Sequence, residues 1–251
     1  MQDPKDIIDI ARPAPEICEK LAKIGSATCS SELALLGIRD PHIRGPRPLK
    51  TGRAIAGPAL TLQMMPQRGD LFDADEYENP DRQLNRHVLY QTQKGDIIVV
   101  DARGDMASGV FGEMMLTFFA GRGGAGIVVD GCIRDSAIAS RLDIGIWVNG
   151  VTPNHPSQTN LMPFAVNVPV ACGDSLVMPG DIIVADDDGV VVVPAALAEK
   201  VIVVAGAHAE WEEFSMYKLL QGADLNKYYP LNPGIEDEYH AWRAAQPAKE
   251  A

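Results

Sequence analysis

The pattern of apolar and polar positions predicts a chain of short buried strands and amphipathic helices. From Gly95 onward, runs rich in Val and Ile are bounded by Gly, Asp and Pro, which is typical of buried strands. The runs are GDIIVVD, GIVVDG, IGIWVNG, FAVNVPV, GDIIVAD and GVVVVP, and 54–65 has the same character. Helical spacing predicts helices at 112–121 and 135–142, and a long helix at about 195–220.

The N-terminal residues also predict helices. Five apolar residues between Ile7 and Ile24 recur at roughly helical spacing, although Pro13 and Pro15 interrupt them. Residues 30–37 predict a second short helix, with Ser as its cap and Gly at its end. Because strands and helices alternate without a linker, we expect one α/β domain over residues 1–251. Its core spans about 24–230, with an N-terminal helix and a C-terminal tail as extensions.

Composition excludes several classes of protein. Lys and Arg number 22 against 34 Asp and Glu, a net charge of -12, so we expect neither nucleic acid nor an anionic membrane as partner. The four cysteines form no CxxC pair, which excludes a disulfide scaffold and a thiolate zinc site. The first residues lack the pattern of a signal peptide, and no apolar run reaches about 20 residues. These features predict a cytoplasmic protein.

The candidate chemistry lies in the segment GEMMLTFFAGRGGAGIVVDGCIRD, from Gly112 to Asp135. Glu113 falls in the first turn of a predicted helix, and Arg134 and Asp135 follow a predicted buried strand. Strand carboxyl ends and helix amino ends are where open α/β folds bind ligands. The backbone N–H groups of residues 112–115 suit an anion, the Arg134 guanidinium suits a carboxylate, and the two acids favour a Mg²⁺-like or Mn²⁺-like ion.

A plain structural interpretation of the same residues exists. Arg134 and Asp135 can form a surface ion pair, and Glu113 can be an ordinary acid at a helix start. The glycines around this strongly apolar strand leave the two interpretations evenly balanced on physical grounds. Asp101 and Asp130 end strands nearby and fit either a supporting role in the site or the capping of a turn. The acidic triplet 186–188 is better explained as a turn, because Gly189 follows it.

VVDGCIRD, the preceding Gly112–Glu113 pair and the later GDIIVADDDGVVVVP resemble the family of regulator of ribonuclease activity A. Its enzymatic branch comprises the divalent-metal-dependent 4-hydroxy-4-methyl-2-oxoglutarate/4-carboxy-4-hydroxy-2-oxoadipate aldolases. That family carries an acid, twenty residues and then Arg-Asp, and the same twenty residues separate Glu113 from Arg134 here. The resemblance covers roughly 24–230. It implies a swivelling β/β/α fold, a central sheet flanked by helices, assembled as a homotrimer or hexamer.

The resemblance also implies roles for individual residues. Asp135 would bind Mg²⁺ or Mn²⁺ directly, and Glu113 would bind it through water. Arg134 would bind the carboxylate and keto oxygens of a small oxoacid, and the amides of Gly112, Glu113, Met114 and Met115 would receive the pyruvate carboxylate. In the aldolases a further acid comes from the neighbouring subunit, so the sites lie at subunit interfaces; Glu210, Glu212 and Glu213 are candidates for it. The acidic insert at 66–86 departs from shorter family members.

The absence of lysine from the strand region also favours a metal-dependent reaction. No lysine occurs between Lys94 and Lys200, so an imine-forming aldolase has no amine there. We therefore expect a class II lyase that releases pyruvate from a 4-hydroxy-2-oxo diacid, with oxaloacetate decarboxylation as a side activity. Two alternatives stay open: a non-catalytic regulator of ribonuclease E that acts by protein contact, and an enolate-forming lyase on another oxoacid.

Overall fold

The computed structural model describes residues 1–71, 80–155, 160–230 and 232–246, and these divide into two compact units. The first unit is Met1–Val201 and the second is Ile202–Ala251. The sequence predicts a single domain with extensions, whereas the C-terminal residues form a unit with a small core of their own. None of the helices within the described ranges is both long and apolar enough to span a membrane.

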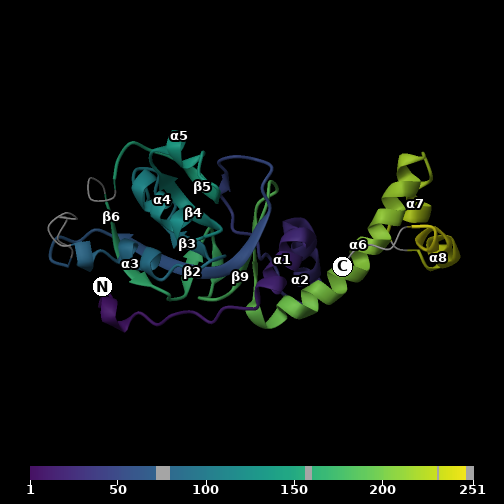
Figure 1. The fold of residues 1–251 in the computed structure, drawn as a ribbon, viewed down its shortest axis with the longest axis horizontal. Helices are drawn as coiled ribbons and strands as arrows, with labels where there is room; N and C mark the ends of the chain where they lie inside the picture. Colours follow the sequence, from purple (N-terminus) through teal and green to yellow (C-terminus); the bar gives the residue numbers. More distant parts are fainter. Residues whose placement is uncertain (72–79, 156–159, 231, 247–251) are drawn as a thin grey trace. The chain divides into compact units, whose positions relative to one another are not determined.

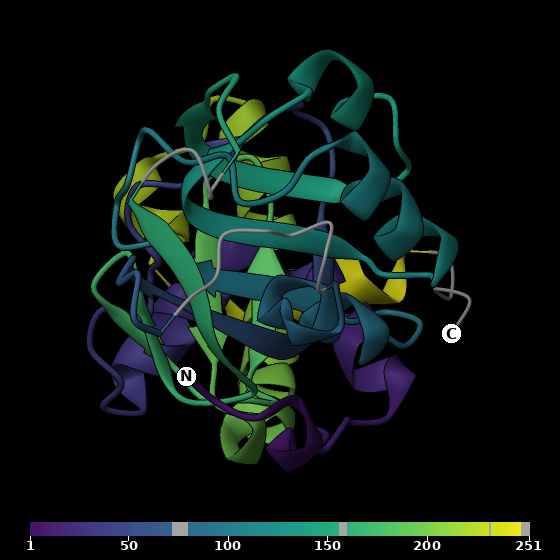
Figure 2. The ribbon, with the colours of Figure 1, turned by 90° about the vertical axis from the view of Figure 1, so that its left-hand side faces the viewer.

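The first unit is built on a mixed sheet in the order β1-β5-β4-β3-β2-β9-β10, with β6 also paired to β2. Parallel pairing joins β2, β3, β4 and β5, and the remaining pairs are antiparallel. Figures 1 and 2 show the parallel strands side by side. The strands are β1 (Arg47–Pro48), β2 (Ile55–Pro66), β3 (Ile97–Asp101), β4 (Gly126–Ile133), β5 (Gly145–Val151), β6 (Leu161–Val166), β9 (Ile182–Ala185) and β10 (Val190–Val193).

Each apolar run that the sequence predicts as a strand contains one, and the predicted α/β class is confirmed. FAVNVPV is the exception in detail, because Asn167 takes a left-handed conformation (φ 52°) and breaks the run. The chain then turns into a separate two-stranded sheet of β7 (Val170–Cys172) and β8 (Ser175–Val177).

Two apolar cores cover the two faces of the main sheet. The larger core packs α3 (Leu84–Tyr90), α4 (Glu113–Gly121) and α5 (Ser136–Ala139) against one face. Figure 1 shows α4 and α5 beside β4 and β5. The second core lies on the opposite face, where side chains of β3, β4 and β5 meet those of β7, β8, β9 and β10. The loops at the carboxyl ends of the parallel strands are therefore held between two packed layers.

The N-terminal boundaries differ from the prediction. Helix α1 (Pro15–Ile24) begins at Pro15 rather than near Ile7, because Pro13 and Pro15 lack the N–H groups that a helix interior requires. Helix α2 (Ser26–Leu35) begins four residues before Ser30, where the Ser26 hydroxyl and backbone N–H both donate to Asp186. The predicted end of this helix is confirmed, since the chain reverses at Gly37 with φ 88°.

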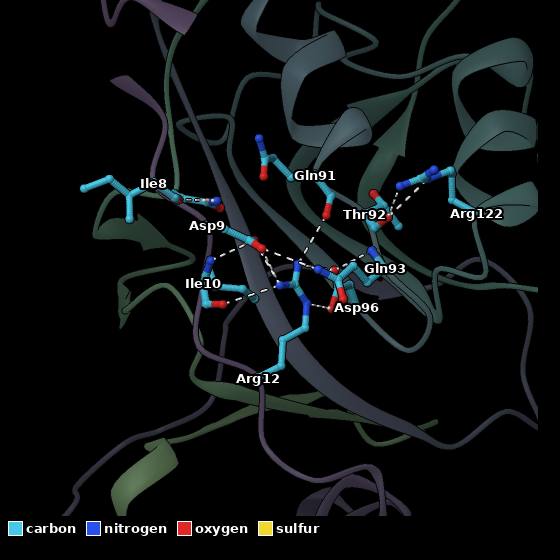
Figure 3. A network of polar contacts seen from close by, with 10 residues as sticks. Ile8, Asp9, Ile10, Arg12, Gln91, Thr92, Gln93, Asp96 and Arg122 are labelled. Atoms are coloured by element: carbon cyan, nitrogen blue, oxygen red, sulfur yellow. Dashed lines mark hydrogen bonds and ion pairs between the residues drawn. The ribbon is translucent and has the colours of Figure 1, made fainter. Parts of the chain in front are cut away.

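The N-terminal segment (residues 7–13) is held to the sheet by a buried ion pair instead of forming a helix. Arg12 donates from Nε and Nη2 to the two carboxylate oxygens of Asp96, each at 2.9 Å, and from Nη1 to Asp9 (Figure 3). The Asp96 side chain is fully buried and also accepts the backbone N–H of Gln93. This network fixes the segment beside the amino end of β3.

The second unit is a small helical body with an aromatic core. It contains most of α6 (Ala198–Leu220), α7 (Leu225–Tyr228) and α8 (Glu236–Ala244). The long helix is predicted correctly, but the residues expected to form a tail make two further helices. Their rings explain this difference, because buried Trp211, Phe214 and Tyr228 pack with Tyr239 and Trp242 and give these helices a core of their own.

Candidate active site

The structure brings the two halves of the predicted motif together at the start of α4. Gly112 is the last residue before this helix, and Asp135 is the residue before α5. A Cβ atom placed on Gly112 would lie 2.6 Å from Oδ2 of Asp135 and 2.7 Å from Nε of Arg134. The φ angle of Gly112 is −122°, which any residue can adopt. The position therefore requires glycine because of the close approach of Arg134 and Asp135.

Arg134, Asp135 and the amide of Glu113 form one polar cluster. Nε of Arg134 lies 3.4 Å from Oδ2 of Asp135, and the backbone N–H of Glu113 donates to the same oxygen at 3.2 Å. Both side chains of the ion pair are 37% exposed, so they are accessible to a small ligand. Asp135 has a left-handed backbone (φ 57°, ψ 36°), which is uncommon outside glycine and tolerated by Asp. This turn directs the carboxylate toward α4.

Backbone pairing between the loop before α4 and the end of β4 sets this geometry. The N–H of Val110 donates to the carbonyl of Cys132, and the N–H of Arg134 donates to the carbonyl of Phe111. Gly109 is required here, because a Cβ there would lie 2.8 Å from the carbonyl oxygen of Asn154 and 3.0 Å from Cβ of Arg134. The sequence analysis missed Gly109, although its place between a predicted strand and a predicted helix is a signal for a close backbone approach.

The start of α4 carries the groups that the sequence analysis expects to bind an anion, namely backbone N–H groups and a nearby guanidinium. The amides of Met114 and Met115 belong to the first turn, where a helix leaves N–H groups without intrahelical acceptors and the dipole favours negative charge. Met114 is 72% exposed, whereas Met115 packs against the larger core. The guanidinium of Arg134 lies beside the same turn, as its approach to Gly112 shows. A carboxylate bound here would meet backbone donors and a cation together.

The donor set fits a hard divalent cation that retains solvent ligands. Asp135 presents an accessible carboxylate, and oxygen donors of this kind suit Mg²⁺ or Mn²⁺. Across the described residues, no group of three or more His, Cys, Asp or Glu side chains could hold a metal. Mg²⁺ sites in proteins commonly use only one or two carboxylates, with water and substrate oxygens as further ligands.

The other candidate acids have structural partners. Asp186 accepts hydrogen bonds from Ser26 and from the N–H of Asp188, and Asp187 accepts from Gly52, so the triplet forms the turn between β9 and β10 as predicted. Asp101 accepts the N–H of Arg103. Asp130 accepts the N–H groups of Ala102 and Gly173, and burial raises its pKa to about 6.

The acids proposed for a neighbouring subunit lie on α6, within the second unit. There, Oε1 of Glu212 lies 3.6 Å from Nε2 of His208. The insert at 66–86 lies partly outside the described residues, at 72–79. The residues on either side of that gap belong to the end of β2 and the approach to α3.

Gly112–Glu113 and Arg134–Asp135 lie within a segment that matches a known protein family. Residues 14–192 match the model of the RraA-like family, described as Aldolase/RraA. The chain belongs to this family. A protein of Halalkalibacterium halodurans with the provisional name 4-hydroxy-4-methyl-2-oxoglutarate aldolase is 33% identical over 156 residues, which cover 62% of this chain and 67% of that protein.

Solved structures of the RraA-like family show the same fold. Streptomyces coelicolor RraAS2, described as an unusual member of the RNase ES inhibitor RraA family, is 44% identical, with a TM-score of 0.75 over 82% of this chain and 98% of that one. An uncharacterized protein from Pseudomonas syringae pv. tomato is 25% identical, with a TM-score of 0.74 over 88% of this chain and 96% of that one. The family thus contains proteins named for aldolase activity and for ribonuclease inhibition.

Proposed function

We propose that this RraA-like protein is a divalent-metal-dependent lyase that cleaves a 4-hydroxy-2-oxo diacid and releases pyruvate. The observation that supports this proposal is the cluster of Arg134, Asp135 and the Glu113 amide at the start of α4. It combines an accessible carboxylate, a guanidinium and first-turn amides within one small volume. A 2-oxo acid carries the matching groups, namely a carboxylate and an adjacent keto oxygen.

The chain's own residues bind and orient the substrate. The first-turn amides of Met114 and Met115 receive the carboxylate next to the keto group, where the helix dipole favours negative charge. Arg134 donates to the keto oxygen and stabilises the negative charge that develops there as the bond breaks. The ion pair with Asp135 fixes the direction of the guanidinium before substrate binds.

The cleavage is a retro-aldol reaction. A water molecule or a carboxylate takes the proton of the C4 hydroxyl, the C3–C4 bond breaks, and its electron pair moves into C3 and the keto group. Protonation at C3 then gives pyruvate, and C4 becomes the carbonyl carbon of the second product. Asp135 and Glu113 would hold a Mg²⁺ or Mn²⁺ ion, which when bound supplies Lewis-acid polarisation of the keto oxygen. Decarboxylation of oxaloacetate develops the same negative charge on C3 and the keto oxygen, so it is expected as a side activity.

The site is open in a single chain, and a homotrimer or hexamer would add groups from a neighbouring subunit. The side chains of Arg134 and Asp135 are more than a third exposed, although a lyase benefits from excluding water. We propose that a neighbouring subunit covers this side, with an acid from the Glu210–Glu213 region of α6 as its contribution.

Pyruvate release tests the proposed function directly. The protein would be offered 4-hydroxy-4-methyl-2-oxoglutarate and oxaloacetate separately, with Mg²⁺, with Mn²⁺ and with a chelator, and pyruvate would be followed with lactate dehydrogenase. We expect release with either metal and none with the chelator. Folded protein that releases no pyruvate from either compound would refute the proposed lyase.

The 44% identity to RraAS2 favours a second candidate, a regulator that inhibits a ribonuclease E-type enzyme by protein contact. The same preparation would be added to a ribonuclease E cleavage assay. The Asp135→Asn variant separates the two candidates, since it removes one charge from the proposed metal site and changes the shape of the surface little. A lyase loses activity in this variant, whereas an inhibitor that acts by contact keeps its inhibition.

A further inference from the structure

A second polar cavity lies at the carboxyl ends of the parallel strands, on the face opposite α4. Its volume is about 460 Å³. Val99, Val128 and Trp147 are paired across β3, β4 and β5, and their side chains belong to the second core. Because side chains alternate along a strand, the residues two positions further share this face. They are Asp101, Asp130 and Asn149, and all three line the cavity.

The floor of this cavity consists of hydrogen-bond acceptors. Asp101 and Asp130 are 7% and 6% exposed. The Oδ1 atom of Asn149 is buried and has no hydrogen-bond partner among the described residues. A buried acceptor without a donor is destabilising, so a ligand that brings N–H groups would stabilise this floor. A Cβ atom on Gly45 would lie 2.7 Å from Asn149 Oδ1, which shows how closely the wall approaches it.

The rim carries the opposite charge. Arg44 and Arg103 both line the cavity and are exposed. Arg44 pairs with Asp40, outside the cavity lining. The guanidinium of Arg103 contacts Sδ of Met65 at 3.9 Å and forms no ion pair with any described residue. A fork of N–H donors is therefore available at the mouth for a carboxylate.

We propose that this cavity binds a small zwitterion of the α-amino acid class. Its ammonium group donates to Asp101, Asp130 and Asn149 on the floor, and its carboxylate accepts from Arg103 at the rim. A simple anion would meet two buried carboxylates, and a simple cation would leave Arg103 without a partner.

The amino acid site is separate from the proposed lyase site and does not depend on it. The two sites use opposite faces of the sheet: Asp130 faces the second core, whereas Arg134 and Asp135 lie beside α4. The chain from Asp101 to Gly112 connects them, since Arg103 and Gly104 line the cavity and Gly112 starts the lyase site.

Binding would first be measured as a rise in melting temperature with each standard L-amino acid at millimolar concentration, because a ligand that binds only the folded state stabilises it. The amino acid with the largest effect would then be titrated by calorimetry into three proteins: wild type, Arg103→Asn and Ala171→Phe. Asn tolerates the left-handed backbone of Arg103 (φ 60°) and removes the guanidinium. Ala171 is an exposed residue of the lining, so Phe there fills the cavity without entering the core.

We expect both variants to bind at least about tenfold more weakly than wild type. Arg103→Asn loses one charge-assisted contact, and Ala171→Phe loses the space for the ligand. Arg141→Asn, an exposed arginine on another part of the unit, is the matched control and should bind as wild type does. Analogues of the same amino acid that lack either the ammonium or the carboxylate should also bind weakly. The proposal is overturned if no amino acid raises the melting temperature, if both variants bind like wild type, or if an analogue lacking one charge binds equally well.

Discussion

The backbone N–H of Glu113 donates to Oδ2 of Asp135 across 3.2 Å, although 22 positions separate the two residues. This bond joins the first turn of α4 to the residue that precedes α5. It places one acidic oxygen, one guanidinium and a set of free helix amides at a common point. The chemistry proposed for this protein depends on that convergence.

Gly112→Ala should disable the site while leaving the fold intact. The new Cβ would lie 2.6 Å from Asp135 Oδ2, so the ion pair must move, and a displacement of about 1 Å can reduce turnover about 100-fold. The measurement is pyruvate release, with thermal unfolding as the check on folding. Gly121→Ala is the matched control, since a Cβ at this helical position meets nothing within 4 Å; it should keep full activity. Equal activity in the two variants would contradict the assigned geometry.

Asp135→Asn should abolish metal-dependent release of pyruvate. Asn keeps the left-handed backbone and an acceptor for the Glu113 amide, but it removes the charge that a divalent cation requires. Mn²⁺ titration by calorimetry would show weaker binding. Asp40→Asn is the control, because Asp40 is also left-handed (φ 59°) and ion-paired to an arginine. Unchanged Mn²⁺ affinity in Asp135→Asn would exclude this residue as a ligand.

Arg134→Lys should restore little of the activity that Arg134→Ala loses. Loss of a donor that stabilises developing charge costs about 10²–10³-fold in kcat. Lysine carries the charge but lacks the planar fork that contacts Asp135 and a keto oxygen together. Steady-state kinetics on all three proteins would separate kcat from KM. Full recovery in the lysine variant would show that charge alone is sufficient.

Arg12→Met should lower the free energy of unfolding by about 3–5 kcal/mol, because it leaves the Asp96 carboxylate buried without its partner. The Asp96 side chain is fully buried, and both of its oxygens accept from Arg12. Urea unfolding monitored by circular dichroism gives the value. Arg68→Met breaks an exposed pair with Asp70 and should cost less than about 1 kcal/mol. Similar losses in both variants would show that the Arg12 network stabilises the fold no more than an exposed ion pair does.

Asp130 should make the protein less stable as the pH rises from about 4 to about 7. Burial raises its pKa from 3.8 to about 6, partly opposed by the N–H groups of Ala102 and Gly173. Between these two values the folded state holds the proton more tightly than the unfolded state, so the free energy of unfolding falls with pH by about 2–3 kcal/mol in total. Asp130→Asn should remove this decrease. Asp143→Asn should not, because the Asp143 side chain is 96% exposed. Parallel pH curves for wild type and Asp130→Asn would contradict the assignment.

The sequence predicts most of the first unit because local signals agree with the tertiary fold. Runs of Val and Ile bounded by Gly and Asp become β3, β4, β9 and β10, since a strand buried on both faces needs apolar residues at every position. The helix at 112–121 follows from its spacing and its starting glycine. These elements carry their own information within a few residues.

The boundaries at the N-terminus and the C-terminal unit depended on contacts that are distant in sequence. The Ser26 start of α2 is set by Asp186, 160 positions away, and the extended segment before Pro15 is held by Asp96. The aromatic residues of the C-terminal unit are spread over two short helices and α6. No short stretch of the sequence shows that these residues share a core.

For the candidate site, the sequence by itself determined the residue types and their spacing: a glycine and an acid, twenty residues, and then Arg-Asp. Only the tertiary structure decided that these residues meet, because pairing between residues 109–111 and the end of β4 folds the loop back on the strand. Tertiary structure also decided the second cavity. Asp101, Asp130 and Asn149 share it because pairing in register places Val99, Val128 and Trp147 on one face, and the residues two positions further follow them. That pairing is set by long-range contacts.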